Sequence, residues 1–600
     1  MNTYRAPVAD MQFVINELAG LDDVAALPGF EEATPDMVAA ILDEAAKFAS
    51  GVLDPLNRIG DRDGAQMSAT GEVTTPPGFK EAYGQFCALG WNGLGKDPEL
   101  GGQGMPQLVA AVVDEMWNAA NMAFQLCPML TSGAVEAIAR NGSDALKQTF
   151  LPRMVTGEWT GTMNLTEPQA GSDLAAVRTA AVPQADGTYR LFGNKIFITY
   201  GEHDFTANIV HLVLARTPGA PPGVRGISLF VVPKFLVNAD GTLGARNDVR
   251  CVSLEHKLGI HASPTAVLAF GDHDGATGYL VGAENRGLEY MFVMMNEARF
   301  GVGVQAIGIA DRAYQLASAY ARERVQGRAA GVDKDAPVAA IVGHPDVRRM
   351  LMTMRAYVEA ARALACVTAA ALDTAGRHPD AATRRERLAF VELMIPIVKG
   401  WSTEVAQKVA YLGVQVHGGM GFIEETGAAQ YARDARITTI YEGTTGIQAN
   451  DFVSRKVARD QGAALAVAVA DVRGIGEALA ATGDATLGVI AGRLAAGADA
   501  LSDAARFVVE RYRDTPRVVL AGSVPLLELA GIVFGGAQLA HAAAIAASRL
   551  AAGHGDAAFM RAKLATARHF ADHVLTKAPG LRDTIVSGGE GVLALADAEI

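Results

Sequence analysis

A short segment between residues 163 and 173 carries the first side chains whose types suit ligand binding. Its sequence, Met-Asn-Leu-Thr-Glu-Pro-Gln-Ala-Gly-Ser-Asp, combines a proline and a glycine with the hydroxyl groups of Thr166 and Ser172. Such a loop offers backbone N–H groups and hydroxyls together, and this set of donors suits an anionic or multi-oxygen ligand. The alternative interpretation is an ordinary turn.

A second candidate follows about 25 residues later, in Lys195–Thr199. Successive side chains of a strand point to opposite faces, so Phe197 and Thr199 share one face and Ile198 lies on the other. This pattern puts an aromatic ring beside a hydroxyl. Taken alone, a phenylalanine in a strand is more often a core residue.

Glu442 is the candidate general base. It follows a run of apolar and β-branched residues and precedes Gly443. A carboxylate inserted at such a point is partly desolvated, and we expect this to raise its pKa towards the range that proton abstraction needs. Considered singly, a glutamate in this position is more often a solvated residue at the start of a helix.

Other chemistries find little support in the sequence. His569 and His573 have the spacing of a zinc-binding helix but lack the glutamate after the first histidine, so we interpret them as a surface pair. There is no Walker A sequence, and the glycines at 101–104 do not separate a strand from a helix as a dinucleotide fingerprint does. The segment 157–161 has no serine at the centre of a nucleophile elbow.

The elements that must position these residues follow from periodicity. Helical runs such as 36–52 and 144–154 fill residues 35–157, whereas 158–272 contains short strand-like runs at 189–200, 209–215 and 227–232. Long helical periods return at 287–326, 346–376 and 383–411, and 462–600 is helical and alanine-rich. We predict an α+β multidomain chain with these parts: 1–34 an N-terminal extension, 35–157 a helical domain, 158–282 a largely antiparallel β-domain, 283–461 a second helical domain and 462–600 an additional helical bundle.

Composition limits the possible partners. The chain has 600 residues, half of them hydrophobic, and a formal net charge of -13, so a broad nucleic-acid-binding surface is not expected. Its four cysteines are far apart and predict neither disulfides nor a zinc site, which favours the cytoplasm. The apolar stretch 518–548 exceeds the length of a membrane span, but Pro525, Glu528, Gln538 and His541 interrupt it, and we interpret it as a buried bundle helix.

Five motifs in order resemble the acyl-CoA dehydrogenase flavoproteins. They are Leu-Thr-Glu-Pro-x-Ala-Gly-Ser-Asp at 165–173, Gly-Asn-Lys-x-x-Ile-Thr at 193–199, Tyr-Ala-Arg-Glu-Arg-x-Gln-Gly at 320–327, Gln-Val-His-Gly-Gly-Met-Gly-Phe at 415–422 and Arg-Asp-Ala-Arg-Ile-x-x-Ile-Tyr-Glu-Gly-Thr at 433–444. The resemblance covers roughly residues 35–455. It implies a helical domain, a β-barrel-like middle domain and a four-helix bundle, with FAD held by the last two and by a neighbouring subunit.

The resemblance also implies a reaction. Glu442 would take the α-proton of an acyl-CoA thioester while the β-hydrogen leaves as hydride to flavin N5, which gives a trans-2-enoyl-CoA in fatty acid β-oxidation. The backbone N–H of Glu442 would help to stabilise the developing enolate oxygen. Some members of the family carry the base one residue before the arginine that matches Arg299, but this position is Ala298 here and Glu297 is one residue off.

The remaining site residues are carried over by position. Phe197 replaces the tryptophan that is common in the family, His344 follows an insertion that makes its alignment uncertain, and Asn296 stands where an aspartate is frequent. The positions that match FAD contacts are Leu165, Thr166, Gly171, Ser172, Phe197, Ile198, Thr199, Arg324, Gln326, His344, Gln415, Gly418, Gly419, Thr444 and Gly446. The positions that match substrate contacts are Ser172, Asn296, Arg299, Tyr441 and Gly443.

The ends of the chain narrow the resemblance to long bacterial members with a C-terminal extension of about 140 residues. These include 3-methylmercaptopropionyl-CoA dehydrogenases and medium- or long-chain fatty acyl-CoA dehydrogenases, which the sequence does not separate. The resemblance implies electron-transferring flavoprotein as the electron acceptor and a homodimer, because the extension occupies the surface that shorter members use to form tetramers. An acyl-CoA oxidase and a DNA-associated flavoprotein of the same fold remain alternatives, although 12 basic and 14 acidic residues in 462–600 give the second little support.

Overall fold

The computed structural model describes residues 3–331, 333, 335 and 337–600. The backbone forms two compact units. The first unit contains residues 1–46, 106–119 and 302–600, and the second contains 47–105 and 120–301. The helices α3 (Pro35–Phe48), α6 (Gln107–Asn141) and α8 (Gly287–Glu323) each contribute residues to both units. The five-part division made from the sequence therefore stays a prediction.

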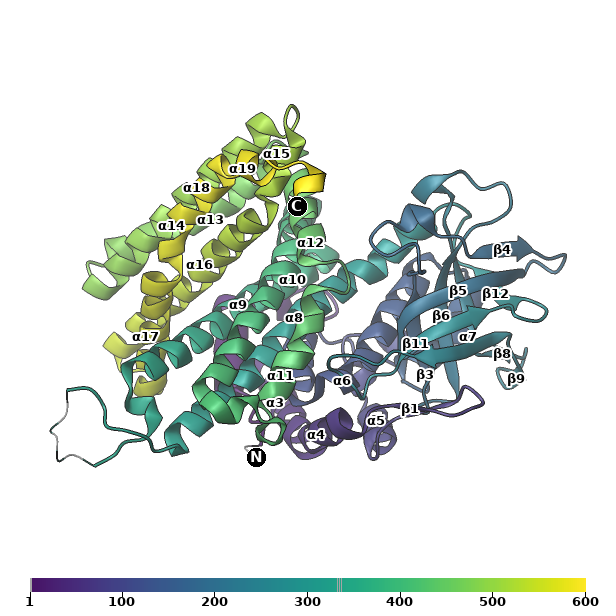
Figure 1. Ribbon diagram of the computed structural model, residues 1–600, viewed down its shortest axis with the longest axis horizontal. Coiled ribbons are helices and arrows are strands. Elements are labelled where there is room, and N and C mark those ends of the chain that lie inside the picture. The colour runs from purple at the N-terminus through teal and green to yellow at the C-terminus, as the bar shows by residue number, and fades with distance from the viewer. Residues whose placement is uncertain (1–2, 332, 334, 336) are drawn as a thin grey trace. The chain divides into compact units, whose positions relative to one another are not determined.

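The second unit is built around a β-sheet (Figure 1). Its strand order is β10-β11-β5-β12-β7-β6-β3, with β4 also paired to β5, and β3 and β6 are the one parallel pair among the described neighbours. The prediction of a largely antiparallel β-domain is confirmed, whereas closure of the sheet into a barrel is not described. The strands are β3 (Trp159–Asn164), β4 (Ala180–Pro183), β5 (Tyr189–Thr199), β6 (Asn208–Ala215), β7 (Ser228–Pro233), β10 (Val249–Leu254), β11 (Thr265–Phe270) and β12 (Ala276–Leu280).

Helices and two small hairpins surround this sheet within the unit. The strands β6 and β7 are buried along their whole length, so apolar residues face both sides of them. One side forms a core with α7 and the second part of α6 through residues such as Ile138, Phe150 and Trp159. The remaining elements are α4 (Asp54–Asp63), α5 (Phe79–Ala88), α7 (Asp144–Val155), and the pairs β1 (Gln66–Met67) with β2 (Val73–Thr74) and β8 (Phe235–Val237) with β9 (Leu243–Arg246).

The first unit is helical. Its longest helices, α9 (Pro345–Arg377) and α10 (Ala381–His417), pack together, and α16 (Ser523–Ala552) packs on both. Local signals explain their ends: Pro345 occupies the first turn of α9, and the Asp380 carboxylate caps α10 by accepting from the N–H of Thr383. The other helices are α1 (Val8–Phe13), α2 (Leu21–Ala25), α3 (Pro35–Phe48), α11 (Ala428–Ala435), α12 (Thr445–Asp451), α13 (Ala463–Ala481), α14 (Ala485–Arg511), α15 (Pro516–Ala521), α17 (Ala557–His573), α18 (Ala578–Ser587) and α19 (Gly589–Val592).

The C-terminal bundle formed by α13 to α19 packs against α9, α10 and α12 of the same unit (Figure 1). Small residues permit a close approach at this contact. A Cβ atom at Gly531 would lie 2.1 Å from Cγ of Trp401, and one at Gly535 would lie 2.6 Å from Cη2 of the same ring. Real atoms do not approach so closely, so only glycine permits α16 to lie against this tryptophan of α10.

Among the residues that the structure describes, two helices have the length and apolar composition of a membrane span, Gln107–Asn141 and Ser523–Ala552, and 78% of the most apolar window of each is buried within the structure. The stretch 518–548 that was interpreted as a bundle helix falls in α15 and α16, with a break at Gly522. Most of α16 is buried among α9, α10, α14 and α17, as a bundle helix should be.

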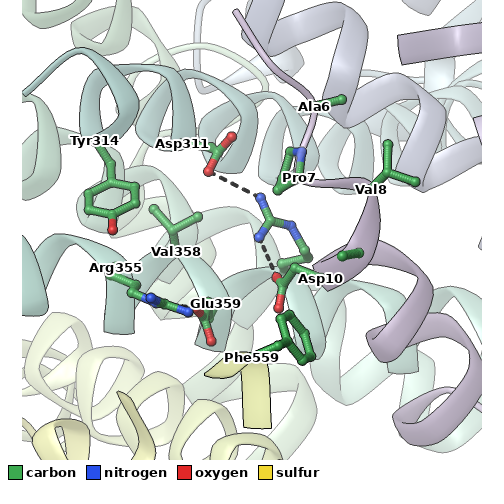
Figure 2. A pocket seen from close by; sticks show the side chains of 12 residues that line it. Ala6, Pro7, Val8, Asp10, Asp311, Tyr314, Arg355, Val358, Glu359 and Phe559 are labelled. Carbon is green, nitrogen blue, oxygen red and sulfur yellow. Dashed lines mark hydrogen bonds and ion pairs between the residues drawn. The ribbon is translucent and has the colours of Figure 1, made fainter. Parts of the chain in front are cut away.

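A buried group of charges joins the N-terminal segment, α9 and α17. Figure 2 shows the part of this group around Asp10, Asp311, Arg355 and Glu359. Lys563 of α17 pairs with Asp10 and lies 3.0 Å from Glu359, while Arg362 of α9 lies 2.7 Å from Asp10 and 2.9 Å from Glu115. Burial raises the pKa of Asp10, but attraction by Lys563 and Arg362 outweighs this and lowers it to about 2. A cavity of about 440 Å³ adjoins the group and is lined by residues that include Pro7, Asp311, Tyr314, Arg355, Val358 and Phe559.

Candidate active site

The residues predicted to form the site fall in both units, and each group is described within its own unit. The loop 165–173, strand β5 and the first half of α8 belong to the second unit. The end of α8, the start of α9, the end of α10 and the segment around Glu442 belong to the first.

The loop after β3 is fixed to β5 by a buried ion pair. Nζ of Lys195 lies 2.8 Å from Oε1 of Glu167 and 3.0 Å from the carbonyl oxygen of Leu165, and the N–H of Ile196 donates to the carbonyl oxygen of Thr166 at 3.0 Å. Burial alone raises the pKa of Glu167, but Lys195 and neighbouring hydrogen bonds lower it to about 2. The carboxylate therefore stays charged and keeps the loop in place.

A β-bulge in β5 presents Phe197. The pairing with β11 shifts between Lys195 and Ile198, and Phe197 adopts a φ of 60°, which is unfavourable for a residue other than glycine. Phe197 is 58% exposed, Thr199 is half-buried and Ile198 is 2% exposed. The bulge thus directs Lys195 and Ile198 into the protein and leaves the ring and the hydroxyl accessible, so the side chain of Ile198 belongs to the core.

The hydroxyl groups beside this ring are available to a ligand. Ser172 is exposed and Thr166 and Thr199 are half-buried, and none of their hydroxyls bonds to another described residue. Gly171 is exposed, with no atom within 4 Å of the place where a Cβ would stand. Leu165 is buried at the start of the loop, so its side chain serves packing.

On α8, Asn296 is exposed and Arg299 is buried. Their neighbour Glu297 is engaged within the second unit: its Oε1 lies 3.2 Å from Nζ of Lys96 and 2.5 Å from the hydroxyl of Ser132. The Glu297 carboxylate therefore forms an ion pair with Lys96, which is consistent with the expectation that Glu297 is not the base.

The structure brings together Arg324, Gln326 and His344. Nε2 of His344 lies 2.8 Å from the carbonyl oxygen of Gln326, whose side-chain oxygen lies 3.4 Å from the guanidinium of Arg324. A backbone bridge between Val325 and Ala340 closes the base of the intervening insertion. The described ends of the insertion that made the alignment of His344 uncertain are thus brought together, and the three polar residues end up adjacent.

The segment at the end of α10 exposes backbone. Gln415 is exposed, and α10 ends at His417, whose ring stacks on Tyr320 at 4.4 Å. Gly418 has a φ of 60° and leads into a short 3-10 helix, η8 (Gly418–Phe422). Both Gly418 and Gly419 have open space where a Cβ would stand, so a ligand can approach their backbone.

Glu442 lies on a short irregular segment between the 3-10 helix η10 (Arg436–Thr439) and α12. Its φ is 55° and that of Gly443 is 90°, so two consecutive residues adopt the left-handed region. Thr444 then caps α12 by accepting from the N–H of Ile447, and Gly446 lies in the first turn. Glu442 is half-buried, which agrees with neither a fully solvated residue nor a core residue.

The neighbouring Tyr441 is fixed by a polar chain. Its hydroxyl bonds to Oε1 of Gln305, whose amide nitrogen lies 3.2 Å from Oδ1 of Asn118. Burial raises the pKa of Tyr441 well above its usual value, and the carboxylates of Glu442 and Asp434 raise it further. Tyr441 therefore stays neutral and supports the segment that carries Glu442.

Two further residues hold the segment that carries Glu442, namely Lys399 and Gln448, and the sequence analysis predicted neither of them. Both are fully buried, and both donate to backbone carbonyl oxygens beside Glu442. A lone lysine within the apolar run 394–401 was the signal for Lys399, because a buried charge requires partners. Nothing in the sequence pattern marks Gln448.

The two groups of residues fit a flavin dinucleotide by their chemistry. An exposed aromatic ring beside hydroxyl donors suits the ring system, and exposed glycine backbone with the Arg324 guanidinium suits a phosphate-bearing nucleotide. By contrast, no group of three or more potential metal ligands occurs in the part of the chain that the structure describes. His569 and His573 stack at 4.2 Å on α17, and Nε2 of His569 lies 3.0 Å from the hydroxyl of Thr353.

Comparison with known proteins supports, over most of the chain, the family resemblance found in the sequence. Residues 36–158, 162–273 and 285–457 match the N-terminal, middle and C-terminal domains of acyl-CoA dehydrogenase, and 448–596 match "Acetyl-CoA dehydrogenase C-terminal like". A 3-methylmercaptopropionyl-CoA dehydrogenase from Ruegeria pomeroyi is 51% identical over 98% of this chain and 99% of its own length.

Two more comparisons extend this result. A broad-specificity linear acyl-CoA dehydrogenase from Mycobacterium tuberculosis, FadE5, is 37% identical over the full length of both chains. The fold resembles an acyl-CoA dehydrogenase from Bacillus anthracis solved with FAD, with a TM-score of 0.73 and 20% identity over 98% of this chain and 93% of that one. On the strength of the domain matches and of the full-length relatives, the chain belongs to the acyl-CoA dehydrogenase family.

Proposed function

We propose that the protein is an FAD-dependent acyl-CoA dehydrogenase in which Glu442 removes the α-proton of the thioester. The observation that carries the proposal is the placement of Glu442: a half-buried carboxylate on a segment held in the left-handed conformation, in a chain of this family. When bound, FAD supplies the acceptor for the β-hydrogen. The products are the trans-2-enoyl-CoA, a proton on Glu442 and a reduced cofactor.

The chain's own residues have distinct tasks in this proposal. The Glu442 carboxylate takes the proton, and its backbone N–H donates to the thioester oxygen as negative charge develops there. Phe197, Thr166, Ser172 and Thr199 hold the flavin side of the cofactor. The residues assigned to its nucleotide side are Arg324, Gln326, His344, Gln415, Gly418 and Gly419, and those assigned to the substrate are Ser172, Asn296, Arg299, Tyr441 and Gly443.

We infer 3-methylmercaptopropionyl-CoA as the first substrate to test. Support comes from the 51% identity to the Ruegeria pomeroyi enzyme, compared with 37% to the linear acyl-CoA dehydrogenase. Linear fatty acyl-CoA esters are the alternative class. Turnover of 3-methylmercaptopropionyl-, butyryl-, octanoyl- and palmitoyl-CoA with a dye acceptor distinguishes the two, and a higher kcat/KM for any linear ester would overturn the choice.

The substitution Glu442→Gln tests the chemistry. The variant keeps the shape of the side chain but cannot accept the proton, so reduction of the flavin by acyl-CoA without air should slow by about 10²–10⁴-fold while bound FAD remains. Glu392→Gln is the matched control, because Glu392 is 57% exposed and pairs with Lys456 at the surface. Turnover of the Glu442 variant within a factor of three of wild type would show that another residue is the base.

The remaining assignments belong to the same proposal. The β-barrel-like closure of the middle domain, the four-helix bundle of 283–461, the homodimer and electron-transferring flavoprotein as acceptor follow the family expectation, and the cytoplasmic location follows from the widely separated cysteines. Light scattering tests the dimer, and a tetramer would contradict it. Rapid reoxidation of the reduced protein by air would instead indicate an oxidase, and DNA binding without turnover would indicate the DNA-associated class.

A further inference from the structure

The carbonyl groups around Glu442 are held by two buried side chains. Lys399 of α10 donates from Nζ to the carbonyl oxygens of Gly443 at 2.7 Å and of Thr438 at 2.8 Å. Gln448 of α12 donates from Nε2 to the carbonyl oxygens of Glu442 at 3.1 Å and of Gly443 at 3.3 Å. Both side chains are fully buried. We call residues 438–444 the base loop; its backbone is therefore fixed from two helices.

This fixation matters because the base loop adopts an unfavourable conformation. An amino acid with a Cβ atom is disfavoured in the left-handed region, and Glu442 has a φ of 55° there. Without restraint, the backbone would rotate towards the right-handed region and carry the carboxylate away. Hydrogen bonds from a charged donor are roughly twice as strong as neutral ones, so the bonds from Lys399 are the strongest described restraint on the loop.

The lysine and the loop depend on each other. A buried ammonium group is costly unless its N–H groups are satisfied, and the two carbonyl oxygens satisfy two of them. A Cβ atom at Gly443 would lie 2.7 Å from Nε2 of Gln448, so the loop also needs glycine at this position to make its contacts. These contacts leave the base loop little room for another conformation.

Helix α10 contacts both sides of the base loop as well. Nε2 of Gln407 donates to the carbonyl oxygen of Ala435, at 2.5 Å, and the hydroxyl of Thr445 donates to Oε1 of Glu404, at 2.6 Å. Lys399 acts between these points. One face of α10 therefore holds the chain from residue 435 to residue 445.

We propose that Lys399 is a positioning residue for proton transfer by Glu442, with Gln448 as the second, neutral donor. The proposal rests on the proposed function, in which Glu442 is the base. Lys399 acts through the backbone of the base loop: it keeps Glu442 in the conformation that directs the carboxylate and the backbone N–H towards the substrate.

The substitution Lys399→Met tests this, because methionine has a similar length but no donor. We expect deuterium exchange of the amides of 436–447 to be at least about tenfold faster in the apoprotein, since the loop loses its charged restraint. In the FAD-loaded protein, flavin reduction by 3-methylmercaptopropionyl-CoA or octanoyl-CoA in a single turnover without air should slow about 100-fold, as expected for a displacement of the base by about 1 Å. FAD content and KM should stay near wild type.

Lys408→Met is the matched control. It removes a lysine from the same helix, but Lys408 is 40% exposed and lies near Glu528 and Tyr357, away from the base loop. Gln448→Met provides a milder test if Lys399→Met does not fold: loss of neutral hydrogen bonds should slow the single turnover about tenfold. Normal single-turnover rates in both Lys399→Met and Gln448→Met would overturn the proposal.

A double substitution separates positioning from a merely structural role. If Lys399 acts through Glu442, Lys399→Met should have little further effect on the residual rate of Glu442→Gln. The same 100-fold loss in that background would overturn the proposal, because Lys399 would then act on something other than the base. If the proposed function itself is wrong, the wild-type flavin will not be reduced by acyl-CoA at all, which is a different result.

Discussion

Lys563 should contribute strongly to the attachment of the C-terminal bundle to the rest of its unit. The side chain is 1% exposed and lies between the carboxylates of Asp10, in the N-terminal segment, and Glu359, in α9. The substitution Lys563→Met fills a similar volume but leaves two buried carboxylates with less positive charge around them. Arg362 and Arg355 still pair with these carboxylates, so the cluster is weakened and not abolished.

The magnitude follows from the pKa of Asp10. A fall from 3.8 to about 2 in the folded protein corresponds to about 2.5 kcal/mol of stabilisation of the carboxylate, and Lys563 is the largest of the attractions that cause it. Removing one partner of a buried pair generally costs about 3–5 kcal/mol. We therefore expect the variant to lose about 2.5–5 kcal/mol of local stability.

The same argument gives the pH dependence. The folded pKa of Asp10 is depressed, so its contribution is fully present above about pH 4 and is lost as the pH falls towards about 2. In the variant this carboxylate has lost its strongest attraction, so its pKa is higher and it contributes less. The difference in stability between wild type and variant should be complete at neutral pH and shrink between pH 4 and pH 2.

Deuterium exchange measures this without assuming that the whole chain unfolds in one step. At neutral pH, amides of α1 and α17 should exchange at least about 50-fold faster in Lys563→Met than in wild type, whereas those of the β-sheet should not change. Arg561→Met is the control, because Arg561 is an exposed cation of the same helix, α17. Exchange in α1 and α17 within threefold of wild type would refute the reasoning that this pair attaches the bundle.

Two further changes test other parts of the structure. Gly531→Ala places a methyl group about where the ring of Trp401 lies, so α16 must move and we expect the free energy of unfolding to fall by about 1–3 kcal/mol in urea unfolding. Gly488→Ala is the control, because the added Cβ atom meets nothing within 4 Å. Equal stability of the two variants would contradict the packing argument. Lys195→Met removes the ammonium group that holds Glu167 and the carbonyl of Leu165, so the loop 165–173 should loosen and the protein should retain less FAD after gel filtration. Full retention of FAD would show that the loop holds its conformation without the ion pair.

Much of the fold was accessible from periodicity and local signals. The helices at 144–155, 345–377 and 381–417 and the strands at 189–199, 208–215 and 228–233 lie where the pattern of apolar residues predicts them, because their burial is set by spacing along the chain. The ordered motifs also identified the family, and Glu442 was named as the base from its motif. The break at Gly522 was missed, since a single glycine does not reveal whether a helix continues through it.

What the sequence by itself determined is the type and order of the elements and the family, and it named the residues that we propose carry the chemistry. The tertiary structure decided how those residues are held. Only folding shows that a bulge at Phe197 turns Lys195 inward, that His344 meets Gln326 across an insertion, and that Lys399 restrains the backbone beside Glu442. The physical reason is that spacing along a chain encodes local geometry, whereas the partner of a buried polar group is chosen by elements far away in sequence, and no local pattern records that choice.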